Sequence, residues 1–184
     1  MSALDFYKDP FFWALMSMFG MVAGTSIFSK HALRRSRIFV AMLLILVLVG
    51  RFVFVLPLCE QPRFEFGEWR WIVGGIIVAL SLPFGAAPVF LVKWWDPPRE
   101  GMKLRTTGIY GLVRNPIYLF EVIWPIGLSI MFNSIYGLAL TPLWWLTFLI
   151  HTLAEEADLE RALGEEYLAY KRKVRGRIFP GLPL

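Results

Sequence analysis

Long apolar segments separated by short polar runs make up most of this chain. A helix that crosses a bilayer needs about 20 mainly apolar residues, and five segments approach that length: 11–29, 38–59, 69–94, 117–132 and 134–153. The polar residues cluster in short runs that could not form a separate extramembrane domain. The pattern therefore predicts an all-α integral membrane protein with about five transmembrane helices, folded as a single membrane-embedded domain over residues 1–184.

The joints between these segments predict local structure. Only Asn133 and Ser134 separate the fourth segment from the fifth, which predicts a tight hairpin between helices 4 and 5. Pro83 lies inside the third segment, where we expect a kink or a break. After Leu153, a polar C-terminal helix is expected to continue from the fifth span on the cytoplasmic side. Its predicted apolar stripe consists of Leu159, Leu163, Tyr167, Tyr170 and Val174.

Composition and charge add class and orientation to this picture. Hydrophobic residues make up 57% of the chain and aromatic residues 16%, which is typical of membrane proteins. Four basic residues lie in 30–37, five in 93–114 and six after Leu153, all on one side of a five-span arrangement. Because positive loops stay in the cytoplasm, the pattern predicts a multi-pass protein with its N-terminus outside and its C-terminus cytoplasmic.

The same distribution excludes several classes of partner. The net charge of +5 comes from basic residues that flank apolar segments, so no nucleic acid is expected as a partner. The single cysteine, Cys59, has no second cysteine to pair with and is interpreted as a packing residue. No grouping of histidines and cysteines predicts a metal site. The acidic start lacks a basic leader, so the first apolar segment is expected to stay in the mature protein.

Two polar motifs flank the predicted hairpin. At about 100° per residue, Glu155 and Glu156 both lie within about 60° of the apolar stripe around Leu159, so we expect them to point inward. Alternatively, they are solvated charges or partners of Arg161 or Lys103. The segment from Arg114 to Tyr118 has its own plain interpretation, because Asn-Pro is a good turn before a helix and an arginine can anchor it at the headgroups.

Together the motifs resemble a known family. Gly108-x-Tyr-x-x-Val-Arg-Asn-Pro-x-Tyr118, followed after the hairpin by Glu155-Glu-x-x-Leu-x-x-x-x-Gly-x-x-Tyr167-x-x-Tyr-x-x-x-Val174, is similar to the isoprenylcysteine carboxyl methyltransferase and phospholipid methyltransferase superfamily. The resemblance covers about residues 103–180 and implies that this part is the cofactor-binding catalytic region. It implies an integral membrane enzyme that transfers a methyl group from S-adenosylmethionine to a lipid-like or small hydrophobic acceptor at the cytoplasmic face, among membrane lipids.

The resemblance also suggests roles for individual residues. The cofactor's ammonium is expected at Glu155 or Glu156, its carboxylate near Arg114 or a tail arginine, and its adenosine against a tyrosine. A carboxylate acceptor would need only Arg175 or Arg177 to orient it. The expected catalytic residues are Arg114, Glu156 and Arg177. The expected cofactor-binding residues are Tyr110, Arg114, Asn115, Pro116, Tyr118, Glu155, Glu156 and Tyr167.

The chain also departs from that family. Many members have His where Asn115 stands, and many have Gly where this chain has Phe120, whose ring could narrow a cleft between helices. Membrane sterol reductases that use NADPH share a similar terminal region, and Glu121 and Trp124 match part of their pattern. An NADPH-dependent double-bond reductase is therefore the alternative.

A second alternative is a non-enzymatic membrane protein, in which Arg51 and Glu121 would be pathway charges. A structural ion pair or snorkelling is the favoured explanation for these two residues. His31 is expected to be a surface residue of a basic loop. His151 precedes Glu155 by one helical turn, so it could shape the cofactor pocket, act as a base or simply pack.

Overall fold

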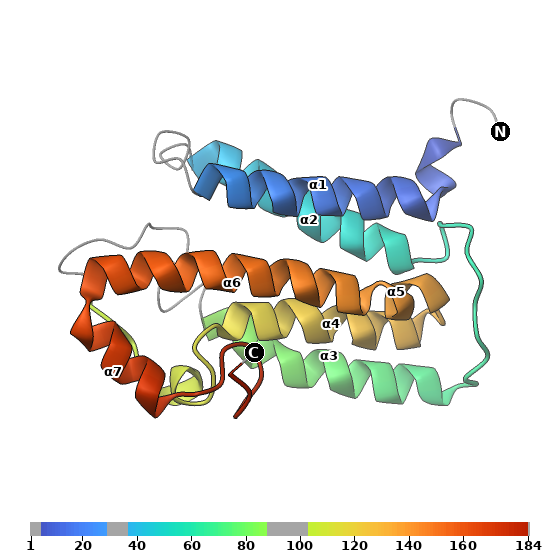
Figure 1. Cartoon of the computed structure of the whole chain (residues 1–184). Coiled ribbons are helices and arrows are strands. Elements are labelled where there is room, and N and C mark those ends of the chain that lie inside the picture. Colours follow the sequence, from blue (N-terminus) through green and yellow to red (C-terminus); the bar gives the residue numbers. More distant parts are fainter. Residues whose placement is uncertain (1–4, 29–36, 88–102, 184) are drawn as a thin grey trace. The chain divides into compact units, whose positions relative to one another are not determined.

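The computed structural model describes residues 5–28, 37–87 and 103–183, and the regular elements among them are helices (Figure 1). An isolated antiparallel bridge between Arg63 and Ser134 is the one β pairing in these ranges. The all-α prediction is confirmed for this part of the chain. The elements are η1 (Phe6–Lys8), α1 (Pro10–Phe28), α2 (Arg37–Val55), α3 (Trp69–Ala87), η4 (Gly108–Gly111), α4 (Pro116–Met131), α5 (Ile135–Ala139), α6 (Thr141–Leu163) and α7 (Glu165–Lys173).

Two helical segments are long and apolar enough to cross a membrane, namely Trp69–Ala86 and Ile135–Leu163. The shorter apolar helices Pro10–Val22, Ile45–Val55 and Pro116–Met131 coincide with the other three predicted spans. The count of five spans stays a prediction. The basic loop that contains His31, the end of the third predicted span and most of the basic loop after it lie outside the described residues.

The described chain forms two compact units, the first from Met1–Leu80 and Ile123–Trp144. In this unit α1 and α2 pack side by side (Figure 1). Gly50 permits their approach, since a Cβ there would lie 3.0 Å from the carbonyl oxygen of Trp13. Gly74 of α3 and Gly127 of α4 permit a close approach of these two helices, because a Cβ on Gly74 would lie 2.5 Å from the carbonyl oxygen of Gly127.

Arg63 joins separate parts of the first unit. It donates to the carbonyls of Leu56 at 2.7 Å and Cys59 at 3.2 Å, just beyond the end of α2, and also to the carbonyl of Phe132. A cationic side chain at the end of a helix satisfies carbonyls that have no partner within the helix. The segment between α2 and α3 is therefore tied to the turn that follows α4.

Arg51 is 1% exposed in the same unit. Its guanidinium lies 5.3 Å from the ring centre of Trp124 and 5.0 Å from that of Trp144. Cation–π contact with two indoles stabilises a buried charge. The side chain is held inside the protein, so snorkelling does not explain Arg51.

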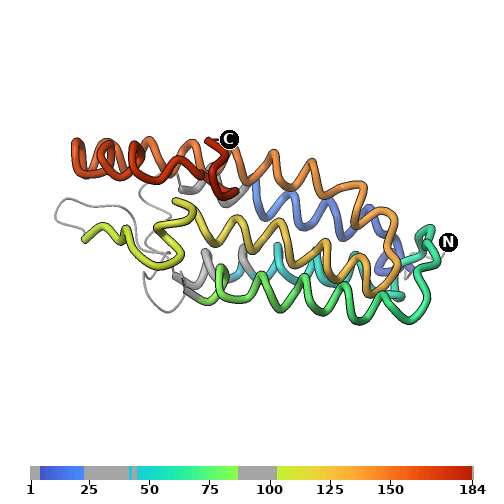
Figure 2. The backbone as a smooth tube through the Cα atoms, turned by 90° about the horizontal axis from the view of Figure 1, so that it is seen from below, coloured from blue at the N-terminus to red at the C-terminus, as the bar shows by residue number. Residues whose placement is uncertain are grey.

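The second unit consists of Ser81–Val122 and Trp145–Leu184. The predicted helix beyond the fifth span does not continue unbroken, because α6 ends at Leu163 and Gly164 adopts a φ of +54°, in the left-handed region that glycine enters freely. Figures 1 and 2 show α7 turning back from the end of α6. The predicted stripe residues still form one cluster with Leu104, because the bend brings their apolar sides together.

Other sequence-based expectations require adjustment. The helix α3 continues through Pro83 as far as Ala87, so the proline does not break it. The predicted fifth helix consists of the short α5, capped by Ser134, and the separate α6, which extends past Leu153 to Leu163. Phe120 packs against Gly85, where a Cβ would lie 2.7 Å from the ring. The tight hairpin between helices 4 and 5 stays a prediction.

Candidate functional site

The candidate site lies in the second unit, where the C-terminal tail pairs with the turn before α4. Arg114 and Asn115 directly precede Pro116, a residue well suited to the first position of a helix. The backbone N–H of Arg114 donates to the carbonyl of Gly176 at 2.8 Å, and that of Asn115 donates to the carbonyl of Arg177 at 2.9 Å. The tail therefore fixes the positions of both motif residues.

The side chain of Arg114 is occupied by the protein itself. Its Nε lies 2.8 Å from Oε1 of Glu156 and its Nη2 lies 3.3 Å from Oε2. Its Nη1 donates to the carbonyls of Val174 at 2.7 Å and Arg175 at 2.9 Å. This two-pronged pairing is the geometry that binds arginine and carboxylate most strongly. It joins the turn before α4, α6 and the tail.

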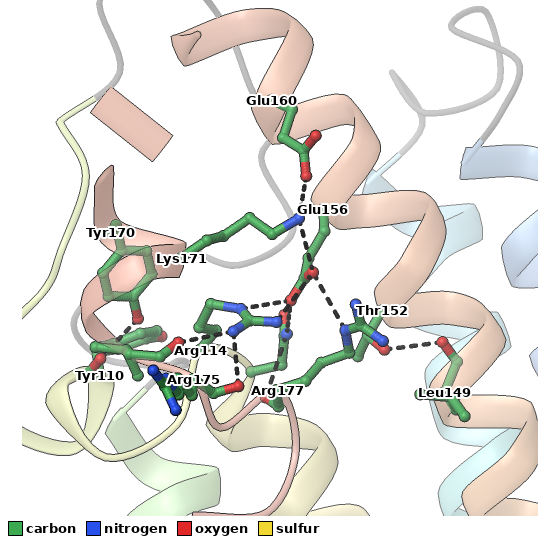
Figure 3. A network of polar contacts seen from close by, with 12 residues as sticks. Tyr110, Arg114, Leu149, Thr152, Glu156, Glu160, Tyr170, Lys171, Arg175 and Arg177 are labelled. Carbon is green, nitrogen blue, oxygen red and sulfur yellow. Dashed lines mark hydrogen bonds and ion pairs between the residues drawn. The ribbon is translucent and has the colours of Figure 1, made fainter. Parts of the chain in front are cut away.

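Glu156 is the centre of the network and is 2% exposed (Figure 3). Besides Arg114, its carboxylate accepts from Nδ2 of Asn115 at 3.1 Å and Nε of Arg177 at 3.2 Å. The Nζ of Lys171 lies 3.8 Å from Oε2 and also pairs with Glu160 one turn further along α6. A buried carboxylate requires this many partners because its desolvation is costly. Three cations thus surround two carboxylates.

Arg177 differs from Arg114 in how much of its guanidinium is engaged. Its Nε contacts Glu156, and its side chain is 17% exposed. Within residues 5–28, 37–87 and 103–183, its Nη1 and Nη2 have no protein hydrogen-bond acceptor. The Arg175 side chain points away from Glu156 (Figure 3). Arg177 is therefore a fixed guanidinium with two donors still available.

The candidate tyrosines fall into two groups. Tyr167 is 1% exposed and Tyr170 is 5% exposed, and both are residues of α7 that belong to the apolar cluster. Tyr170 donates from Oη to the carbonyl of Tyr110 at 2.6 Å. Tyr110 and Tyr118 are half-buried, and the Tyr118 ring packs 5.4 Å from that of Phe148. Only the second group keeps surface on which a ligand ring could stack.

Burial raises the pKa values of Tyr110, Tyr167 and Tyr170. It raises the pKa of Tyr110 to about 12, with Arg105 lowering it and Glu155 raising it by smaller amounts. Burial also raises the pKa values of Tyr167 and Tyr170, and the Glu156 carboxylate adds to both shifts. All three phenols are therefore neutral near pH 7 and can act as hydrogen-bond donors and apolar surfaces.

The structure brings together much of the predicted constellation. Arg114, Asn115, Glu156 and Arg177 meet in one network, and the inward orientation of Glu156 is confirmed. Glu155 is half-buried, and its charge adds a small amount to the rise that burial causes in the pKa of Tyr110. His151 is buried, with its ring 6.3 Å from that of Tyr118. In the part of the chain that the structure describes, no cluster of three His, Cys, Asp or Glu side chains could hold a metal ion.

Sequence reasoning missed Lys171, Glu160 and the tail carbonyls. Glu160 follows Glu156 by one helical turn, so its place on the same side of α6 was readable from the sequence. The contact of Lys171 depends on the bend at Gly164, which no helical periodicity shows. The carbonyls that bind Arg114 belong to an irregular tail, where periodicity carries no signal at all.

The chain is similar to known methyltransferases over part of its length. The family model described as phospholipid methyltransferase matches residues 71–166. The chain is 39% identical over 72 residues to protein-S-isoprenylcysteine O-methyltransferase of Homo sapiens, a match covering 39% of this chain and 25% of that protein. It is 32% identical over 112 residues to protein-S-isoprenylcysteine O-methyltransferase A of Arabidopsis thaliana, covering 60% and 56%. These matches span less than two thirds of either relative. No solved structure matches the chain.

Proposed function

Because the chain belongs to the phospholipid methyltransferase family, we propose that it is an integral membrane methyltransferase that uses S-adenosylmethionine and methylates a lipid-like acceptor. One observation carries the proposal: Arg114 and Glu156, from the two motifs that flank the predicted hairpin, form a buried two-pronged ion pair inside the matched region. If both motifs bind the same ligand, they must meet in the folded chain, as this ion pair shows for Arg114 and Glu156.

The residues present fit the chemistry of this cofactor. Its carboxylate would find two available donors on Arg177, and its ammonium would find Glu155 beside Tyr110. The half-buried rings of Tyr110 and Tyr118 offer surfaces for adenosine. Asn115 and Pro116 would hold the turn that carries these groups. The bound cofactor would supply an activated methyl group.

The geometry suggests a division of roles among the proposed residues. Arg114 and Glu156 satisfy each other, so we assign them to positioning, together with the buried Tyr167. Arg177 would contact a ligand. Methyl transfer is a direct displacement, and the protein accelerates it mainly by aligning the reacting groups and excluding water. A rigid network around Glu156 serves that alignment.

The acceptor is proposed to enter from the bilayer. The relatives named above act, by their names, on isoprenylcysteine, and the family description names phospholipids, so both acceptor types suit the proposal. Two described segments could span a membrane. We propose the full arrangement to be five spans with the N-terminus outside and residues 103–180 forming the site at the cytoplasmic face, following the positive-inside distribution.

Equilibrium binding to purified protein tests the proposal. S-adenosylhomocysteine and NADPH are titrated in parallel, and methyl transfer from radiolabelled S-adenosylmethionine into lipid extracts is then measured. Saturable binding of S-adenosylhomocysteine with label entering a lipid supports the proposal. Binding of NADPH alone would establish the reductase instead, and binding of neither ligand would favour a non-enzymatic role.

A further inference from the structure

The two arginines of the network differ in how they are used. Arg114 directs three nitrogen atoms at protein acceptors, namely both oxygens of Glu156 and the carbonyls of Val174 and Arg175. Among residues 5–28, 37–87 and 103–183, Arg177 directs only Nε at a protein acceptor, namely Glu156. An arginine whose donors are already hydrogen-bonded to the protein gains little from a further anion, whereas one with two adjacent free donors matches a carboxylate or phosphate.

We propose that Arg177 is the anion-binding residue of the site, that it holds a carboxylate or phosphate of a ligand through Nη1 and Nη2, and that Glu156 and Lys171 position it. The inference rests on the proposed function, and it extends that function by separating the arginine that binds from the arginine that supports. The anion is the cofactor's carboxylate or an anionic group of the acceptor.

The tail backbone holds Arg177 in place. Its N–H donates to the carbonyl of Leu182 at 3.0 Å, and its carbonyl accepts the N–H of Asn115. The preceding residue, Gly176, is so closely packed that a Cβ would lie 2.6 Å from the carbonyl oxygen of Phe179 and 2.9 Å from that of Leu112. A guanidinium fixed at both its backbone and its Nε loses little conformational entropy when it binds an anion.

The charge balance of the network favours an anion as well. Arg114, Arg177 and Lys171 carry three positive charges against those of Glu156 and Glu160, so one positive charge remains. Lys171 pairs with both Glu156 and Glu160 on successive turns of α6. Of the two arginines, Arg177 is the more exposed, with 17% of its side chain exposed against 4% for Arg114, so a ligand anion can reach it more easily.

Calorimetric titration of purified protein tests the assignment with two ligands. One is S-adenosylhomocysteine, and the other is S-adenosyl-3-thiopropylamine, which has a hydrogen in place of the carboxylate. The variants are Arg177→Gln, Arg177→Lys and the control Arg172→Gln, which removes an exposed α7 cation paired with Glu165 outside the network. Thermal unfolding of every variant shows that it is folded, and the KM for the lipid acceptor is measured alongside.

If Arg177 holds the cofactor's carboxylate, the wild-type protein binds S-adenosylhomocysteine about 10- to 100-fold more tightly than the analogue. Arg177→Gln abolishes that preference, Arg177→Lys restores part of it, and Arg172→Gln leaves it intact. If Arg177 holds the acceptor's anion, Arg177→Gln raises the acceptor KM and leaves both affinities unchanged.

Two results overturn the inference while leaving the proposed function intact. One is an Arg177→Gln protein with wild-type affinities and a wild-type KM. The other is an equal loss in Arg172→Gln, which would show a general effect of charge. A wild-type protein that binds neither ligand overturns the methyltransferase proposal itself, and the inference with it.

Discussion

Removing the charge of Glu156 is the perturbation that most directly tests the candidate site. The side chains of Arg114 and Glu156 are 4% and 3% exposed, and Arg177 and Lys171 depend on the same carboxylate. Glu156→Gln keeps the size of the side chain but turns an amide N–H₂ toward the cations. Only Glu160 then remains to balance three positive charges.

The expected loss of stability is large, because one partner of a buried ion pair is removed and the others stay buried. Such a change costs about 3–5 kcal/mol. At about 2–4 °C per kcal/mol for a chain of this size, the Tm should fall by roughly 6–20 °C. Thermal unfolding in detergent, followed by circular dichroism or tryptophan fluorescence, measures the shift. Binding of S-adenosylhomocysteine should weaken in parallel, because Arg177 loses its support.

Two controls make the result specific. Glu165→Gln removes a carboxylate whose side chain is 82% exposed and whose pair with Arg172 is solvated, so its effect should stay within about 1 kcal/mol. A double-mutant cycle with Arg114→Gln isolates the pair, and the two substitutions should be strongly non-additive. Our account of the network would be refuted by an unshifted Tm in Glu156→Gln, or by additive effects in the cycle.

Three further outcomes follow from local geometry. Gly176→Ala should destabilise the tail by about 1–3 kcal/mol and weaken binding at Arg177, because its Cβ would meet backbone atoms. In the control Gly111→Ala, the added Cβ has its nearest neighbour at 3.6 Å, so this variant should unfold like the wild type. Equal Tm values for the two variants would contradict the prediction. Arg63→Gln should cost about 1–3 kcal/mol, since the carbonyls at the end of α2 lose their donor; an unchanged Tm would show that water replaces it. The raised pKa of Tyr110 implies stability that is fully present below about pH 10, the ordinary pKa of a phenol, and is lost as the pH rises toward about 12. In a pH series of unfolding curves, Tyr110→Phe should reduce this fall but not remove it, because the pKa values of Tyr167 and Tyr170 are raised as well. An unchanged fall would assign the whole effect to other groups.

Periodicity and composition located the first four helices of this fold, but not the divisions between α5, α6 and α7. Runs of apolar residues predict helices because a backbone in lipid must satisfy its own hydrogen bonds, and α1 to α4 begin close to the predicted limits. The inward orientation of Glu156 followed from its spacing relative to Leu159 on one helix. Such predictions succeed because they concern neighbours within a few turns of the same chain.

The arrangement of the site depends on contacts between residues far apart in the sequence. Glu155 and Glu156 are equivalent by spacing, yet only Glu156 forms the centre of the network, because the turn before α4 and the tail both meet α6 at that side chain. The sequence likewise does not show which of Arg114 and Arg177 has its guanidinium hydrogen-bonded within the protein. The carbonyls of Val174 and Arg175 accept hydrogen bonds from Nη1 of Arg114, whereas Nη1 and Nη2 of Arg177 have no protein acceptor within the described residues.

Gly164 is a position where sequence periodicity and the tertiary structure give different results. Its identity permits a left-handed φ, but helical spacing continues smoothly from Leu159 to Val174, so the sequence pattern alone predicts one helix. The bend turns α7 back, where its buried cluster packs against Leu104 and Lys171 pairs with Glu160 and Glu156. Helix content and the identity of the motif residues were encoded locally. Which charges neutralise each other and which remain for a ligand was decided by tertiary packing, because Coulomb and hydrogen-bond energies depend on distances that only the folded chain sets.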